Sequence, residues 1–116
     1  MRAAALGLAL VLLPGCAVLE SRNTMATCQA LDTATTLQAV HMGAVETNPI
    51  IAPAVAHPVL FIALKGALVW FLWTHWDRIE PAGKATVNLV SCAAPAINLR
   101  AIRLESQNNP PRPNPN

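Results

Sequence analysis

Charged residues are scarce in this chain. Only 12% of its 116 residues are Asp, Glu, Lys or Arg, whereas about a quarter of the residues are charged in ordinary soluble domains. The formal net charge is +2, and the basic residues form no stripe that could neutralise phosphates. This composition excludes a disordered polyelectrolyte and argues against a protein that binds nucleic acid.

Common catalytic motifs are also missing. The sequence holds no G-x-S-x-G, no H-E-x-x-H and no glycine-rich phosphate loop. The spacing of His41, His57 and His75 matches no metal-ligand motif. We therefore expect no catalytic residues, no metal site and no cofactor, and we expect that the chain is not an enzyme.

Apolar residues dominate instead. They make up 53% of the chain, its mean hydropathy is +0.39, and the apolar residues are concentrated in long runs. The length allows one small domain. We therefore expect this domain to lie in a lipid bilayer.

The first sixteen residues have the anatomy of a secretory signal. Arg2 precedes the apolar stretch from Ala3 to Leu13, which is too short to span a bilayer, since a span needs about 20 residues. Leu13-Pro14-Gly15-Cys16 resembles the lipobox of bacterial lipoproteins. The resemblance implies that residues 1–15 are a signal peptide and that Cys16, acylated by fatty acids such as palmitate, anchors the chain on the periplasmic side of the cell membrane. The alternative is an ordinary signal in which Cys16 stands by chance.

Two cysteines remain if Cys16 is acylated. Cys28 and Cys92 would then form a possible pair on the oxidising side of the membrane. Both lie inside apolar segments, and this position favours buried free thiols over a disulfide. Both alternatives stay open.

Three helical segments follow a lipidated spacer at residues 16–24. The sequence predicts the first from Met25 to Val45, the second from Pro58 to Trp76 and the third from Lys84 to Leu104. The second is the most hydrophobic and rises about 28 Å, which matches the hydrocarbon core of a bilayer. We therefore expect an all-α chain with a three-helix membrane-embedded bundle over residues 25–104.

Prolines and tryptophans mark the ends of these segments. Asn48 is a good N-cap and Pro49 suits a first helical position, so a short helical turn is expected to begin there. Trp70, Trp73 and Trp76 recur at the far end of the second helix, where indoles prefer the interface. Pro95 is expected to kink the third helix. Residues 105–116, rich in Pro and Asn, are expected to form a disordered tail.

Each predicted helix also carries polar residues. Asp32, Thr36 and Gly43 share one face of the first helix, and Lys65 lies about 10 Å along the second. The third helix has a stripe that includes Ser91. We expect the polar faces to meet in an intramembrane cluster formed by Asp32, Thr36, Lys65, Asn88 and Asn98.

Asp32 and Lys65 are the residues of this cluster that a membrane should reject. Each costs at least about 2.5 kcal/mol on insertion scales, so an ion pair between them would offset part of both costs. Alternatively, Lys65 extends to the near interface or Asp32 is protonated. A clamp that fixes helix packing is favoured over an ion path, because three helices leave hardly any room for a pathway.

One set of residues resembles a known family signature. Asp32 and Thr36 precede a G-x-x-E-x-N-P helix-turn motif, then comes a lysine in the second helix and an asparagine near the end of the third. The pattern resembles that of a family of small bacterial and archaeal membrane proteins of unknown function, and the resemblance covers about residues 28–104. It implies a three-helix membrane domain and no particular activity. The residues of this pattern after Thr36 are Gly43, Glu46, Asn48, Pro49, Lys65 and Asn98.

Taken together, these features predict a lipid-anchored integral membrane protein that acts as a structural or partner-binding module. Its partners would be the bilayer and either a second copy of the chain or another membrane protein. Helical spans favour the inner membrane over the outer membrane. The alternatives are a phage-type lysis protein, holin-like or spanin-like, and a small ion-conducting oligomer.

Overall fold

The structure is a computed structural model that describes residues 16–44, 49 and 51–109. Within these residues the regular elements are all helical and there is no strand, so the all-α prediction is confirmed for this part of the chain. Three parts of the sequence analysis lie outside the described residues: the signal segment 1–15, Glu46 and Asn48 of the helix-turn motif, and tail residues 110–116.

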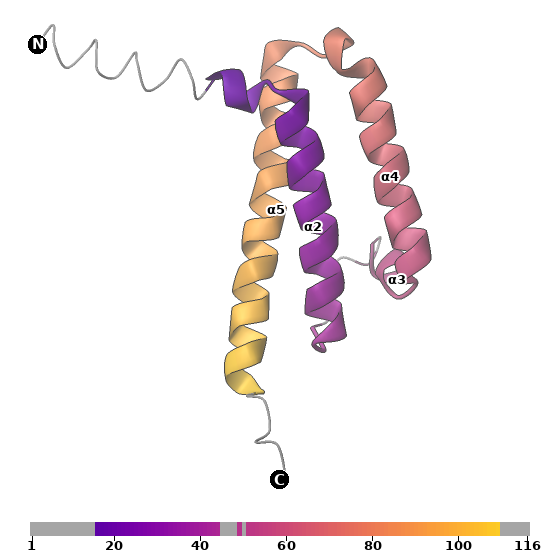
Figure 1. The fold of residues 1–116 in the computed structure, drawn as a ribbon, viewed down its shortest axis with the longest axis vertical. Coiled ribbons are helices and arrows are strands. Elements are labelled where there is room, and N and C mark those ends of the chain that lie inside the picture. Colours follow the sequence, from indigo (N-terminus) through magenta and orange to yellow (C-terminus); the bar gives the residue numbers. More distant parts are fainter. Residues whose placement is uncertain (1–15, 45–48, 50, 110–116) are drawn as a thin grey trace, which may run out of the picture.

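Three long helices dominate the structure (Figure 1). The helix α2 packs extensively along α5 and less extensively against α4, and the short α3 contacts the start of α4. In Figure 1, α2 and α5 lie side by side while α4 stands further away. In chain order the elements are α2 (Arg22–His41), α3 (Ala52–Val55), α4 (Pro58–His75), the 3-10 helix η1 (Trp76–Arg78) and α5 (Pro81–Asn108).

The first long helix begins earlier than predicted. Ser21 is its N-cap, and the Ser21 hydroxyl oxygen accepts a hydrogen bond from the backbone N–H of Thr24 at 3.5 Å. A serine in this position stabilises a helix start. The expected spacer at residues 16–24 is therefore partly helical: it contains the first residues of α2 and a helical turn at residues 16–19.

The same helix ends at His41, four residues before the predicted end. Gly43 has a φ of +99°, a conformation that favours glycine. The N–H of Gly43 donates to Val40 O, and the N–H of Ala44 donates to Ala39 O, each at 3.0 Å. These bonds form a Schellman cap. Gly43 therefore terminates α2 instead of extending its polar face.

Prolines were expected to mark the starts of the next two helices, and this prediction is confirmed for the second of them only. The connector helix α3 begins at Ala52, not at Pro49, which lies in a turn. The helix α4 begins at Pro58 as predicted, because a proline at the first position loses no helical hydrogen bond. It ends at His75, and the predicted last residue, Trp76, opens η1.

The last helix is longer than predicted at both ends. It begins at Pro81, again a proline in the first turn. At its other end Asn109 donates its backbone N–H to Glu105 O at 2.9 Å and its side-chain amide to Glu105 Oε1 at 2.8 Å. Residues 105–108 of the expected disordered tail are therefore helical. The helix also continues through Pro95, which is buried.

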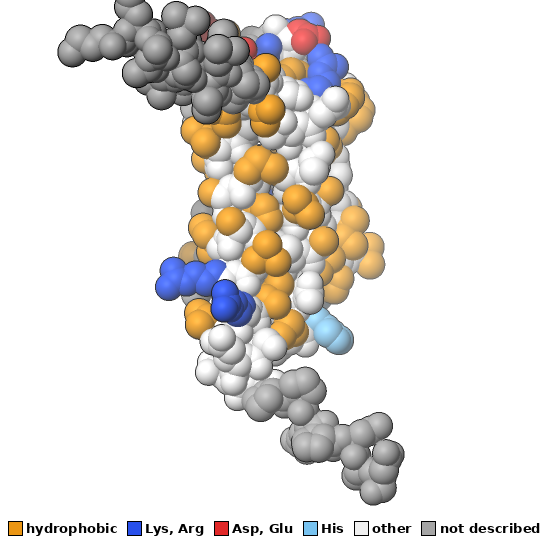
Figure 2. All heavy atoms as spheres, turned by 60° about the vertical axis from the view of Figure 1, so that its left-hand side comes forward, with side chains coloured by type: hydrophobic (Ala, Val, Ile, Leu, Met, Phe, Trp, Pro, Cys, Tyr) orange, Lys and Arg blue, Asp and Glu red, His pale blue; other side chains and the backbone are white. Residues whose placement is uncertain are grey.

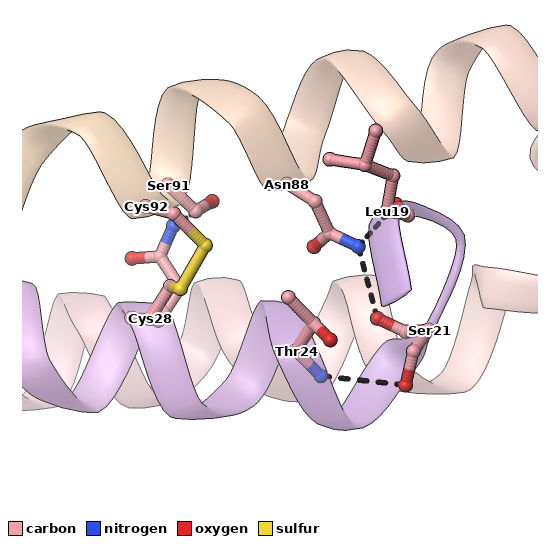
Figure 3. Close-up of a disulfide and its surroundings, with 8 residues drawn as sticks. Leu19, Ser21, Thr24, Cys28, Asn88, Ser91 and Cys92 are labelled. Carbon is pink, nitrogen blue, oxygen red and sulfur yellow. Dashed lines mark hydrogen bonds between the residues drawn. A yellow bond between two sulfur atoms is a disulfide. The ribbon is translucent and has the colours of Figure 1, made fainter. Parts of the chain in front are cut away.

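A disulfide joins the two helices that pack most closely. Cys28 of α2 and Cys92 of α5 are bonded, with their Cα atoms 4.8 Å apart (Figure 3). The sequence analysis favoured buried free thiols, because both cysteines lie inside apolar segments, and the disulfide shows that this prediction is wrong. The packing of α2 along α5 brings together these two cysteines, which lie 64 positions apart in the sequence.

Apolar side chains cover much of the outer surface. On the face seen in Figure 2, side chains of Lys, Arg, Asp and Glu lie toward the two ends, with hydrophobic side chains between them. Large apolar residues are exposed along both α4 and α5, among them Val59, Trp70, Leu89, Val90 and Ile97. Two helical segments are long and apolar enough to cross a membrane, Pro58–Arg78 and Pro81–Asn108. The helix α2 has 20 residues, but it is not apolar enough to be a third.

Replacing Cys28 and Cys92 together by serine should lower stability while leaving the helices in place. Closing a loop of this length contributes about 4 kcal/mol by restricting the unfolded chain. Thermal unfolding of the protein in detergent, with helicity followed by circular dichroism, measures this loss. Ala30→Ser/Ala93→Ser is the matched control, because it introduces two serines at exposed positions of the same two helices and keeps the disulfide. Equal stability of the double variant and this control would contradict the prediction.

Candidate functional site

An ion pair lies between α2 and α4. The Lys65 ammonium donates to Asp32 Oδ2, and its second contact is Gln29 Oε1 at 2.9 Å. The side chains of Asp32 and Lys65 are only 12% and 21% exposed. The structure thus brings together the two charges that the sequence analysis had paired.

The third helix also contributes to this carboxylate. From α5, the Asn98 side-chain nitrogen lies 3.0 Å from Asp32 Oδ1 and 2.8 Å from Thr36 Oγ1. The Thr36 hydroxyl in turn donates to Asp32 Oδ1 at 3.4 Å. One carboxylate therefore links all three long helices, because Lys65 of α4 reaches one of its oxygens and Asn98 of α5 reaches the other.

Gln29 is a member of this cluster that the sequence analysis missed. Its amide oxygen accepts from Lys65, while its amide nitrogen donates to the Ser91 hydroxyl of α5 at 2.8 Å. Gln29 precedes Asp32 by three residues, so the two share one helix face. That spacing was the signal that could have identified it. We call Gln29, Asp32, Thr36, Lys65 and Asn98 the polar cluster.

Asn88 does not belong to the polar cluster. It is fully buried, but its amide nitrogen donates to the backbone carbonyls of Leu19 and of Ser21, the latter at 3.0 Å (Figure 3). Its spacing from Asn98 placed both on one face of α5, yet ten residues separate them by about 15 Å along the helix. The expected cluster is therefore split between two levels of the molecule.

Further contacts hold the helix ends together near Asn88. The indole N–H of Trp76 donates to Glu20 O at 3.0 Å. Arg22 forms an ion pair with Asp77 at 2.7 Å and stacks over the ring of Trp73 at 5.2 Å. These contacts tie the start of α2 to the end of α4 and to η1.

Lys65 borders open space in three pockets, two of which also reach α2. A groove of about 520 Å³ lies between α2 and α4, where the small residues Ala30 and Gly66 leave room. A second pocket of about 380 Å³ reaches Asp32 and Asn98. Between these spaces, the Lys65 side chain connects α4 to α2 through its bonds to Asp32 and Gln29.

The polar cluster is largely self-contained. Its charges and amides bond mainly to one another, and within the described residues no three His, Cys, Asp or Glu side chains gather to hold a metal ion. His41 and His57 lie exposed, and His75 stacks on Phe71 with ring centres 4.4 Å apart.

Comparison with known proteins places this chain in a family. Residues 24–97, more than half of the chain, match the family described as "Domain of unknown function (DUF5658)". The chain belongs to this family. The matched range includes Asp32, Lys65 and Asn88, while Cys16 and Asn98 lie outside it. No curated protein and no solved structure matches the chain.

Replacing Asp32 by alanine should destabilise the protein strongly, because Lys65 would lose its countercharge. Breaking one partner of a buried ion pair costs about 3–5 kcal/mol. The double variant Asp32→Asn/Lys65→Met should be milder than Asp32→Ala, since it leaves no unpaired charge. Thermal unfolding of the purified variants measures both effects.

The control for this comparison is the exposed pair of Arg22 and Asp77, in which the Asp77 side chain is 85% exposed. Asp77→Asn should have an effect far smaller than that of Asp32→Ala, because surface pairs contribute little. If the double variant is the least stable of all, the pairing does not stabilise the fold.

Proposed function

We propose that this chain is a lipid-anchored integral membrane protein without catalytic activity, and that it acts as a structural or partner-binding module. The observation that supports this proposal is the polar cluster: charged and amide side chains from three helices bond to one another, while the outer surface of α4 and α5 is apolar. In a bilayer, such a cluster would fix how the helices pack.

The proposal treats α2, α4 and α5 as a three-helix bundle in the membrane. The segments containing α4 and α5 have the length and apolarity of spans. The helix α2 turns Gln29, Asp32 and Thr36 inward, and all three are buried. Packing these polar groups against the other helices offsets the cost of placing α2 in lipid.

The signature on which the sequence resemblance rests fits this arrangement. Asp32, Thr36 and Lys65 form the centre of the clamp, and Gly43 ends α2 so that the chain can turn toward α4. The turn motif would thus set the length of the first helix, while the charged residues would hold that helix between its neighbours.

Two features support a periplasmic position for the start of α2. The first is the resemblance of Leu13 to Cys16 to a lipobox, and Cys16 is an exposed free cysteine at this end. The second is the disulfide, because Cys28 lies about 9 Å along α2 from Arg22 and disulfides persist in oxidising compartments. With three crossings of the inner membrane, the end of α5 would then lie on its cytoplasmic side.

A small ion-conducting oligomer is the second candidate, because the pocket of about 380 Å³ reaches both charges of the pair. The two candidates differ in what Asp32→Asn does. In a channel this substitution would abolish ion flux into proteoliposomes while the protein stays folded. In a clamp there is no flux to lose, and only stability changes.

Intact mass of the membrane-extracted protein tests the lipid anchor. We expect a chain that begins at Cys16 and carries acyl groups, because the lipobox directs cleavage and acylation at this cysteine. Cys16→Ser should yield an uncleaved precursor without acyl mass that remains in the membrane through α4. A natural chain that begins at Met1 without acyl mass would refute lipidation and leave the membrane domain as the better description.

A further inference from the structure

The residues between Cys16 and α2 form a turn that is bound by side chains from the rest of the molecule. Three consecutive backbone carbonyls of this turn accept hydrogen bonds: Asn88 donates to the first and the third, and Trp76 donates to the second. The carbonyls belong to Leu19, Glu20 and Ser21. We call Asn88 and Trp76 the dock.

The dock residues direct their polar groups at this turn. Asn88 is fully buried and Trp76 is 3% exposed. Asn88 gives its amide hydrogens to the turn, while its Oδ1 has no partner among the described residues. A buried amide whose donor side alone is satisfied is costly to keep. Its bonds to the turn are thus the contacts that compensate for its burial.

The turn itself is short and internally bonded. Glu20 donates its N–H to Cys16 O at 3.0 Å, and Ser21 donates to Val18 O at 3.2 Å. Ser21 then caps α2. Cys16 is therefore connected to the dock and to the first turn of α2 without a flexible tether.

The helix α2, which follows the turn, needs a connection that holds it in the membrane. Unlike the two candidate spans, α2 lacks the apolarity to cross a membrane, and it buries Gln29, Asp32, Thr35 and Thr36 only when it packs against its neighbours. Apart from these neighbours, little in α2 itself would hold it in lipid.

We infer that the dock couples the acylated Cys16 to α2, so that the lipid holds this polar helix in the membrane against α5. This inference rests on the proposed lipidation of Cys16. The lipid would thereby take part in assembly of the fold, beyond attaching the protein to a surface. Its acyl chains would lie in the leaflet in which α2 begins. The dock would keep the start of α2 at a fixed position relative to these chains.

The test uses the full chain in its native membrane with the double variant Asn88→Ala/Trp76→Phe, which removes the donors of the dock. The matched control is Asn23→Ala/Trp70→Phe, the same substitutions at exposed positions. Intact mass reports acylation, and hydrogen exchange reports protection of the amides of Glu20 and Ser21. We expect the dock variant to keep its acyl mass and to exchange these amides at least about tenfold faster, since several hydrogen bonds are lost.

A second variant removes the lipid and leaves the dock intact. In it, an ordinary cleavable signal replaces residues 1–15 and Cys16→Ser prevents acylation. We expect the fraction of Cys28 and Cys92 that is free to react with a thiol reagent to rise several-fold, because without the lipid α2 lies against α5 less often while the fold assembles and the disulfide forms. Asn23→Ala in the acylated chain should leave this fraction unchanged.

The outcomes separate the two proposals. A natural chain without acyl mass refutes lipidation, whatever the exchange data show. An acylated natural chain whose exchange is the same in the dock variant refutes the coupling. Full pairing of Cys28 with Cys92 in the chain without lipid refutes the role of the lipid in holding α2.

Discussion

The carboxylate of Asp32 is the group on which the arrangement of the long helices depends. It lies near the middle of α2, is largely buried, and takes hydrogen bonds from Lys65 of α4 and Asn98 of α5. A charge in an apolar setting is stable only when partners surround it. The helix α2 packs against both other long helices, so its carboxylate can bond to both neighbours (Figure 1).

Directional contacts, more than close apolar packing, hold α4 in place. Its only buried residue is Phe61, and open space lies beside Lys65 in the three pockets that this residue borders. By contrast, α2 and α5 pack closely and share a disulfide. The molecule thus consists of a cross-linked helix pair and a third helix pinned to it at two levels, by Lys65 near the middle and by Trp76 and Asp77 at one end.

The sequence predicted features that depend on local residue pattern. Pro58 marked the start of α4, and the isolated charges of Asp32 and Lys65 indicated a pair, because each would be costly alone. The sequence did not predict the partners of Asn88, since backbone carbonyls carry no residue-specific signature. It also placed Gly43 within a helix, although the conformation of this residue ends α2. Contacts between distant segments, such as the Cys28–Cys92 bond, became visible only once the helices were packed.

The family match covers the dock but not Cys16. Asn88 and Trp76 fall within the matched residues 24–97, whereas Cys16 and the turn carbonyls lie before them. Because the dock binds main-chain carbonyls, it sets little requirement on the side chains of the turn. By our proposal, the dock fixes where the chain enters α2, and the segment before it attaches α2 to the bilayer. In this chain the proposed attachment is an acylated cysteine, and it compensates for the polarity that the clamp imposes on α2.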